Sequence, residues 1–181
     1  QSAREAMEKA VTQTLRAGTI IRYLRDFVEK RESHKSPEDI NEVIREAVSL
    51  GMVGHSHSNV KLALALDPSL PRIPIDKVQL QQVLLNLVRN AIEAMAEVEM
   101  RELAISSNVV KDGLRITVQD TGPGLAPHVA TRLFQPFVTT KADGMGIGLK
   151  ICQSIIEGHG GTIEAKQGGR GATFVIHLPF A

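Results

Sequence analysis

The chain has 181 residues, of which 43% are hydrophobic and 23% are charged, and its 21 lysine and arginine residues nearly balance 20 aspartate and glutamate residues. This composition predicts a globular protein with one full domain and a smaller element, and it gives no electrostatic basis for nucleic-acid binding. No apolar run approaches the roughly 18 residues of a membrane span, and the lone Cys152 excludes an internal disulfide and fits a reducing compartment. We therefore expect a cytoplasmic fragment with no nucleic-acid or membrane contact, whose parent protein could still be membrane-anchored.

Residues 2–33 are predicted to form one long helix, because apolar side chains recur there at three- and four-residue steps. A helix of this length with one apolar stripe and no core of its own needs a partner helix. We expect a helix pair or bundle made with a second copy of the chain; packing on the rest of this chain is the alternative. The sequence starts at Gln1, without methionine, in the middle of what is already a helical pattern. We therefore expect a fragment of a longer protein.

A domain boundary is expected near Ser36, which gives a helical element over residues 1–35 and a second domain over residues 36–181. Ser36 is predicted to cap a new helix that ends near Gly51, with Pro37 at its first position and Asp39 as the capping-box acid.

The remaining elements alternate between helices and strands. Alternating apolar residues predict a strand over 60–66, and Asp76 is placed to cap a helix over 77–97. Further expected elements are strands 104–110 and 114–119 as a hairpin, a short helix 127–134, a helix 146–157, and strands 162–166 and 172–178. The layout predicts an α/β (α+β) sandwich, a mixed sheet with helices on one face.

Four polar or glycine-rich motifs follow one another in the second half of the chain, over residues 86–90, 120–124, 144–148 and 168–171. One glycine cluster carries little information, but this ordered set indicates a nucleotide pocket.

The first motif contains Asn86 and Asn90, which are four residues apart and so project from one face of the predicted helix. In an apolar stretch each unpaired amide would cost about 1–3 kcal/mol, and an amide oxygen is a suitable ligand for Mg²⁺. The alternative is that both amides face solvent or cap a loop, and this pair taken alone favours that alternative.

The second motif begins with Asp120 at the end of a predicted strand, where its carboxylate could accept a hydrogen bond from the exocyclic amine of adenine. Gly122 and Gly124 would let the backbone approach a flat base. The alternative is an ordinary tight turn.

The third motif places Gly144, Gly146 and Gly148 before a predicted helix, so backbone amides and a helix N-terminus could face a phosphate, with Lys141 adding a positive charge. A purely structural loop is the alternative, and the motif matches neither the P-loop nor the dinucleotide-binding pattern. The last motif, which precedes Thr173, is predicted to be a hairpin turn, with contact to the pocket as a secondary possibility.

Taken together, the motifs resemble the ATP-binding domain of sensor histidine kinases and of the wider group with Hsp90, gyrase B and MutL. The resemblance runs from about residue 75 to 180, includes an F box at residues 134–137, and implies the Bergerat (GHKL) fold. It assigns Asn90 to Mg²⁺ through the phosphates, Asp120 to adenine, and Lys141 with the glycine-loop amides to the phosphates of ATP. The full set of ATP-binding residues expected from the resemblance is Asn86, Asn90, Asp120, Gly122, Gly124, Phe137, Thr140, Lys141, Gly144, Gly146, Gly148, Leu149 and Thr173.

The resemblance also indicates transfer rather than hydrolysis. Hydrolysing members of the group carry a glutamate where this sequence has Asn86, and an amide cannot act as a base. Residues 14–27 resemble the second helix of the dimerisation hairpin in the FixL-like branch of sensor kinases. None of the six histidines has the sequence context of a phosphoacceptor, which implies that the accepting histidine lies outside this fragment.

The implied partners are the acceptor helix of the same or a partner subunit, a response-regulator receiver domain, and a second copy in a full-length homodimer. Two other functions stay open from the sequence. One is an ATPase of the Hsp90/MutL kind or a related serine-directed kinase, and the other is a non-catalytic nucleotide-binding dimerisation module.

Overall fold

The structure is a computed structural model of the 181-residue chain, and it describes residues 7, 34–53, 59–125, 132–139, 146–166 and 170–180. The chain divides into two compact units, residues 1–34 and 35–181. Met7 is helical and exposed, and the rest of the predicted helix over 2–33 lies outside the described residues. All elements below belong to the second unit.

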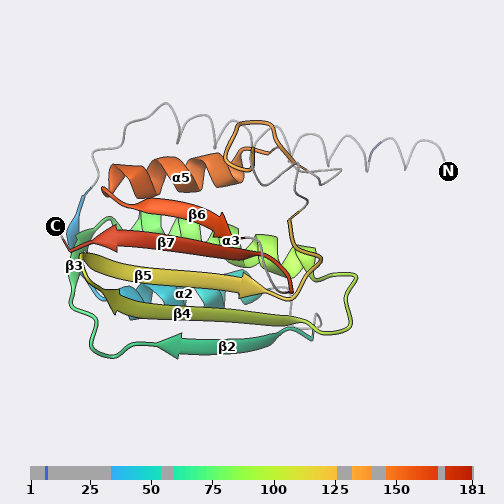
Figure 1. The fold of residues 1–181 in the computed structure, drawn as a ribbon, viewed down its shortest axis with the longest axis horizontal. Coiled ribbons are helices and arrows are strands. Elements are labelled where there is room, and N and C mark those ends of the chain that lie inside the picture. The colour runs from blue at the N-terminus through green and yellow to red at the C-terminus, as the bar shows by residue number, and fades with distance from the viewer. Residues whose placement is uncertain are drawn as a thin grey trace. The chain divides into compact units, whose positions relative to one another are not determined.

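A five-stranded mixed sheet forms the body of this unit, in the order β2-β4-β5-β7-β6 (Figure 1). The strands are β2 (Lys61–Leu66), β4 (Glu102–Val110), β5 (Gly113–Asp120), β6 (Thr162–Lys166) and β7 (Thr173–Pro179). Strand β2 runs parallel to β4, and every other neighbouring pair is antiparallel. The mixed sheet expected from the sequence is therefore confirmed.

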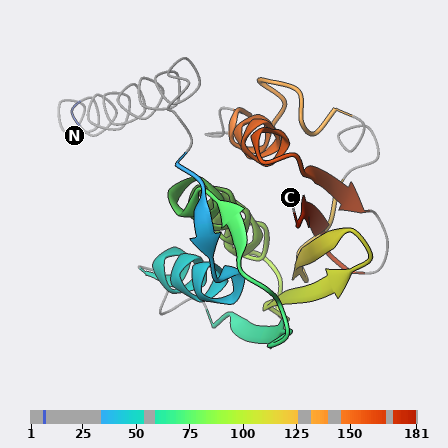
Figure 2. The ribbon, with the colours of Figure 1, turned by 90° about the vertical axis from the view of Figure 1, so that its left-hand side faces the viewer.

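Within the described part of the chain, three helices cover one face of this sheet: α2 (Ile40–Met52), α3 (Lys77–Ala94) and α5 (Gly148–Gly158). Figure 2 shows the cyan, green and orange helices together on one side of the strands. Alternate residues of β5 point into this layer, so that Leu114, Ile116 and Val118 are buried. Each such side chain contributes about 1.5–3 kcal/mol on burial, which makes the α3 face of the sheet the centre of the core.

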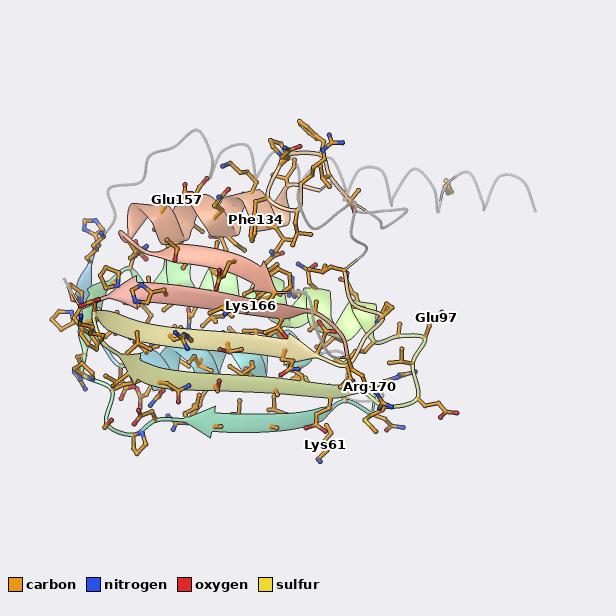
Figure 3. All side chains as sticks on the ribbon, viewed as in Figure 1. Lys61, Glu97, Phe134, Glu157, Lys166 and Arg170 are labelled. Atoms are coloured by element: carbon orange, nitrogen blue, oxygen red, sulfur yellow. The ribbon has the colours of Figure 1, made fainter. Side chains whose placement is uncertain are left out.

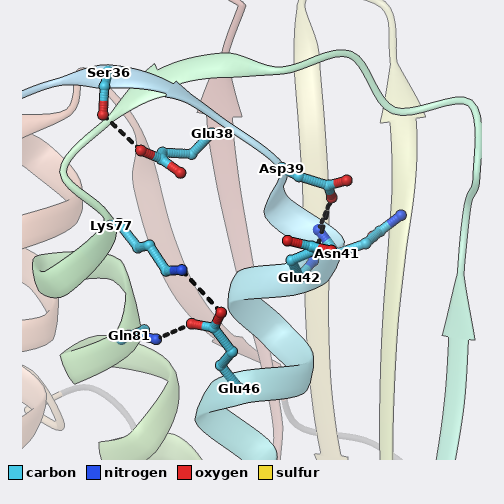
Figure 4. A network of polar contacts seen from close by, with 8 residues as sticks. All are labelled: Ser36, Glu38, Asp39, Asn41, Glu42, Glu46, Lys77 and Gln81. Atoms are coloured by element: carbon cyan, nitrogen blue, oxygen red, sulfur yellow. Dashed lines mark hydrogen bonds and ion pairs between the residues drawn. The ribbon is translucent and has the colours of Figure 1, made fainter.

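The start of the domain differs from the sequence prediction. Ser36–Glu38 is a short strand, β1, paired antiparallel with β3 (Ile73–Ile75) in a separate two-stranded sheet. Helix α2 begins at Ile40 and is capped by Asp39, whose Oδ1 accepts hydrogen bonds from the backbone N–H groups of Asn41 (2.9 Å) and Glu42 (3.2 Å). The prediction of Ser36 as the cap was wrong, because Asp39 supplies the capping acceptor and Ser36 donates to Glu38 instead (Figure 4).

Most other boundaries agree with the sequence to within one or two residues, but α3 ends at Ala94, three residues before the predicted end at 97. The hairpin of β4 and β5 and the final strands are confirmed, and α5 starts two residues later than predicted. Residues 132–134 form a turn rather than the end of a helix, and residues 127–131 lie outside the described part.

Charged side chains stabilise the helix layer and occupy the sheet edges. The carboxylate of Glu46 on α2 accepts from the ammonium of Lys77 (2.8 Å) and from the amide of Gln81, both on α3 (Figure 4).

The edge strands of the sheet carry lysines. Lys61 lies on edge strand β2 and Lys166 on edge strand β6 (Figure 3). Lysines on edge strands disfavour pairing with the strands of another molecule.

Candidate functional site

Asp120, the last residue of β5, is buried at 3% exposure and is fixed by the backbone around it. Its Oδ1 accepts hydrogen bonds from the N–H groups of Gly122 (2.8 Å) and Ala172 (3.2 Å). Burial raises the pKa of this carboxyl, and the two backbone hydrogen bonds act in the opposite direction. The result is an acidic group with a fixed orientation at the end of the sheet.

The second carboxylate oxygen of Asp120, Oδ2, makes no hydrogen bond to the described residues. Both hydrogen bonds of the carboxylate use Oδ1. Among the described residues, no fully enclosed side-chain nitrogen or oxygen lacks a partner. Oδ2 therefore reaches solvent-accessible space, where it can accept a hydrogen bond from an N–H donor such as an exocyclic amine.

The space around Asp120 admits no side chain at the neighbouring glycine positions. A Cβ on Gly122 would lie 2.9 Å from Asp120 Oδ1 and 3.1 Å from the Ala94 carbonyl oxygen at the end of α3. Gly124 and Gly171 both have left-handed φ values, +80° and +77°, and a Cβ on Gly171 would lie 1.8 Å from the Asp120 carbonyl oxygen. These glycines are thus required first by the close packing of the protein's own backbone around the carboxylate.

Asn86 and Asn90 lie on α3 and are both half-buried. The amide nitrogen of Asn86 donates to the Cys152 sulfur at 3.1 Å, and Asn90 also has a polar contact. Neither amide is simply solvated. Cys152 is buried, and burial raises the pKa of its thiol to about 12. The thiol is therefore a packed, protonated side chain of the core.

Gly146, the first described residue of the glycine motif, contacts Phe137 of the F box. The Phe137 N–H donates to the Gly146 carbonyl oxygen at 3.0 Å, and both residues have φ of +65°. The Phe137 side chain is 78% exposed. A Cβ on Gly148 would lie 2.8 Å from Asn86 Oδ1, so that the start of α5 is in contact with α3.

The predicted residues thus fall into two clusters along α3. Asp120, Gly122 and Gly124 gather at its C-terminal end, near Ala94, while Gly148 contacts Asn86 further back along the helix. Leu149 is half-buried against the core, and Thr173 opens β7, opposite Gln119 of β5. Thr140, Lys141 and Gly144 lie outside the described residues.

Ala172, Ala94 and Cys152 belong to this site although their roles were not predicted from the sequence. Ala172 and Ala94 act through backbone groups, which carry no side-chain signal. Cys152 could have been found from the sequence, because it follows Gly148 by four residues and so lies on the same face of the predicted helix.

Helix α5 differs from the other two helices at its N-terminus. Asp39 caps α2 and Asp76 caps α3 through side-chain oxygens, whereas α5 begins at Ile147–Gly148 with no side-chain cap. The first N–H groups of a helix need acceptors, and an anion is a suitable one. A buried carboxylate with one oxygen that makes no hydrogen bond to the described residues, and a helix start with no side-chain cap, are features expected of a nucleotide-binding α/β domain.

Comparison with known proteins agrees with this class. Residues 75–181 match the model of the histidine kinase-, DNA gyrase B-, and HSP90-like ATPase family. The chain is 48% identical over 178 residues to the sensor protein FixL of Bradyrhizobium diazoefficiens, covering 97% of this chain and 35% of FixL. The catalytic domain of the histidine kinase ThkA has 34% identity and a TM-score of 0.72, with 82% of this chain and 96% of that domain covered.

Two larger solved structures are also similar. Full-length ShkA in complex with AMPPNP has a TM-score of 0.80 and 30% identity, and the match covers 96% of this chain and 37% of ShkA. ThkA in complex with the response regulator TrrA also has a TM-score of 0.80 and 30% identity, over 94% of this chain and 49% of that one. The chain belongs to the histidine kinase-, DNA gyrase B-, and HSP90-like ATPase family, as a catalytic ATP-binding domain of the sensor histidine kinase type.

The chain spans about a third of the length of the curated sensor kinases it matches. Within its described part, no helix is both long enough and apolar enough to span a membrane. The same residues hold no cluster of three or more histidine, cysteine, aspartate or glutamate side chains that could bind a metal ion.

Proposed function

We propose that this chain binds ATP with Mg²⁺ and donates the γ-phosphoryl group to a histidine on an acceptor helix outside the fragment. The observation that carries the proposal is Asp120, whose Oδ1 is held by two backbone N–H groups while Oδ2 stays available. Such a carboxylate can accept a hydrogen bond from the N6 amine of adenine, and Gly122 and Gly124 let the backbone come close to the ring.

The phosphates would lie between α3 and the start of α5. The uncapped N–H groups at Gly148 are suited to phosphate oxygens, and Gly144, Gly146, Thr140 and Lys141 of the preceding loop would complete this contact.

An oxygen of the kind that Mg²⁺ prefers is present on α3, in the side-chain amide of Asn90. Mg²⁺ commonly takes one or two protein oxygens and completes its shell with substrate phosphates and water. We therefore place Asn90 at the metal, which when bound would neutralise charge on the phosphates.

Positioning and charge neutralisation dominate phosphoryl transfer, so the chain needs no catalytic base of its own. Asn86 stands where a hydrolytic enzyme would need a base, and its neutral amide cannot take a proton from water. The arrangement thus favours donation of the phosphoryl group to a separate acceptor.

The remaining parts of the proposal concern the parent protein. We infer that residues 1–35 belong to a dimerisation hairpin and that residues 36–181 form the catalytic domain, a division supported by the two compact units of the chain. Expected partners are the acceptor helix of the same or a second subunit, a response-regulator receiver domain, and a second copy in a homodimer. We place the catalytic domain in the cytoplasm.

The test mixes the chain with γ-labelled ATP, Mg²⁺ and a separate protein that carries an acceptor hairpin. Label on the acceptor's histidine is expected, and Asn90→Ala should abolish it while Asp112→Asn, an exposed hairpin-turn change, should not. Phosphate release by the chain alone, lost in Asn90→Ala, would instead identify an ATPase. Undetectable ATP binding by calorimetry would leave a non-catalytic module.

A further inference from the structure

Cys152 is the only side chain recorded as a hydrogen-bond partner of Asn86 among the described residues. Its sulfur accepts from Asn86 Nδ2 at 3.1 Å, while its own S–H points toward the Val83 carbonyl oxygen, 3.9 Å away. Val83 and Asn86 are three residues apart on α3, so the thiol of α5 joins two successive turns of that helix.

The Asn86 amide lies against two residues of α5 that are one turn apart on the same face of that helix. Its Nδ2 donates to Cys152, and at Gly148 an added Cβ would come within 2.8 Å of Oδ1 and 3.0 Å of Nδ2. The glycine at 148 therefore makes room for the amide, and the thiol one turn later provides an acceptor for its nitrogen. Both contacts act on a single side chain.

Because the Cys152 S–H is directed at the Val83 carbonyl oxygen, the sulfur acts as an acceptor toward the Asn86 amide, and this determines which end of the amide is free. Nδ2 is occupied by Cys152, whereas Oδ1 accepts no recorded hydrogen bond. Because no fully enclosed side-chain oxygen in the described part of the chain lacks a partner, Oδ1 is accessible to solvent. It faces the first turn of α5, where the phosphates are proposed to lie.

We infer that Cys152 is a positioning residue for the nucleotide site: it holds the Asn86 amide so that Oδ1, an acceptor, faces hydrated Mg²⁺ bound to ATP. The inference rests on the function proposed above. An acceptor suits a water molecule on Mg²⁺, whose hydrogens point away from the ion, whereas the amide N–H₂ would be repelled by the same water. With an apolar residue at 152, rotation of the Asn86 amide by half a turn would cost little free energy. Oδ1 and Nδ2 would then exchange places, and Oδ1 would face the Mg²⁺-bound water only part of the time.

The test measures ATP affinity of the full 181-residue chain by calorimetry, once with excess Mg²⁺ and once with EDTA. The ratio of the two dissociation constants reports the coupling to Mg²⁺. Loss of one neutral hydrogen bond corresponds to about a 3–10-fold effect, so Cys152→Val should lower the coupling by that factor and leave the affinity in EDTA unchanged. Cys152→Ser, which keeps an acceptor, should restore it.

Two controls separate positioning from packing. Ile156→Val removes one methylene from a fully buried neighbour on α5 and should leave the coupling as in the unmodified chain. In an Asn86→Ala background, Cys152→Val should have no further effect on the coupling, because its partner is gone. Urea unfolding shows that each variant is folded, and Cys152→Ala provides a second apolar variant.

An unchanged coupling in both apolar variants would overturn the inference and leave the proposed function intact. An equal loss of affinity with Mg²⁺ and with EDTA would also overturn it, since it would indicate a packing role. If the unmodified chain binds no ATP at all, the proposed function fails together with the inference.

Discussion

His159, the residue after α5, accepts a hydrogen bond through Nε2 from the backbone N–H of Asp76, at a distance of 2.9 Å. Because Nε2 accepts, the ring proton lies on Nδ1, which donates to the Ile155 carbonyl oxygen at 2.8 Å. Asp76 is the capping residue of α3, where its side chain accepts from the Gln79 N–H. The C-terminal end of α5 is therefore joined to the N-terminal end of α3, at the opposite end of α5 from the contact with Asn86.

We expect His159→Ala to lower the free energy of unfolding by about 1–3 kcal/mol, because it leaves the backbone N–H of Asp76 without its acceptor in a mostly buried place. Urea unfolding at pH 7 provides the measurement. His34→Ala, at an exposed histidine, is the matched control and should change little. Equal stability of the two variants would show that the contact between α5 and α3 at this end is not stabilising.

Asp120→Asn should weaken ATP binding by about 10–150-fold, the loss expected for a hydrogen bond to a charged group. The substituted amide can keep Oδ1 as the acceptor for Gly122 and Ala172, and it then presents Nδ2, a donor, to the N6 amine of adenine. An inosine nucleotide carries a carbonyl acceptor at that position, so its affinity relative to ATP should rise. Titration of both nucleotides against the variant checks this, with Asp112→Asn as the control. An unchanged preference for ATP would exclude Asp120 as the reader of the base.

The stability of Asp120→Asn relative to the unmodified chain should depend on pH. Burial raises the pKa of Asp120 above its ordinary value of 3.8, so the folded state holds the proton more tightly than the unfolded chain does. The contribution of Asp120 to the free energy of unfolding therefore falls as the pH rises from 3.8 through the raised pKa, and it levels off above it. We expect Asp120→Asn to be at least as stable as the unmodified chain at pH 7.

Urea unfolding of both proteins as a function of pH measures this difference directly. The advantage of the variant should shrink as the pH falls toward 3.8. If the variant is instead less stable than the unmodified chain at pH 7 and becomes relatively more stable in acid, the pKa of Asp120 is lowered in the folded state rather than raised.

The periodic elements were predictable from the sequence, because each follows from a repeat of apolar residues within one segment. Helix α3 and the hairpin of β4 and β5 are examples. Strands β1 and β3 were missed, since each has three residues with a central proline and neither is long enough to show a period. Their pairing is a tertiary contact.

The candidate site shows the same division. The glycines and polar residues could be picked out from their order along the chain, yet their partners could not. Asp120 is held by Ala172, 52 residues later, and Asn86 by Cys152, 66 residues later. Gly122 was predicted to be a glycine because a ligand approaches it. The structure gives a more direct reason, which is that the Asp120 carboxylate leaves no space for a side chain there.

Two glycines provide a matched test of the packing around Asp120. Gly171 has φ of +77°, and a Cβ there would lie 1.8 Å from the Asp120 carbonyl oxygen, so backbone must move to admit it. Gly158, the last residue of α5, has no atom within 4 Å of an added Cβ. We expect Gly171→Ala to cost about 3 kcal/mol or more. Gly158→Ala should instead gain about 0.5–1 kcal/mol, because alanine restricts the unfolded chain and favours the helix.

Urea unfolding of both variants measures the two changes, and calorimetry with ATP adds a functional comparison. Displacement of the backbone at Gly171 should also shift Ala172, one of the two N–H donors that fix Asp120. ATP affinity should therefore fall in Gly171→Ala even under conditions where that variant is still folded, whereas Gly158→Ala should bind ATP as the unmodified chain does. Normal affinity in a folded Gly171→Ala variant would mean that the orientation of Asp120 does not depend on this backbone contact.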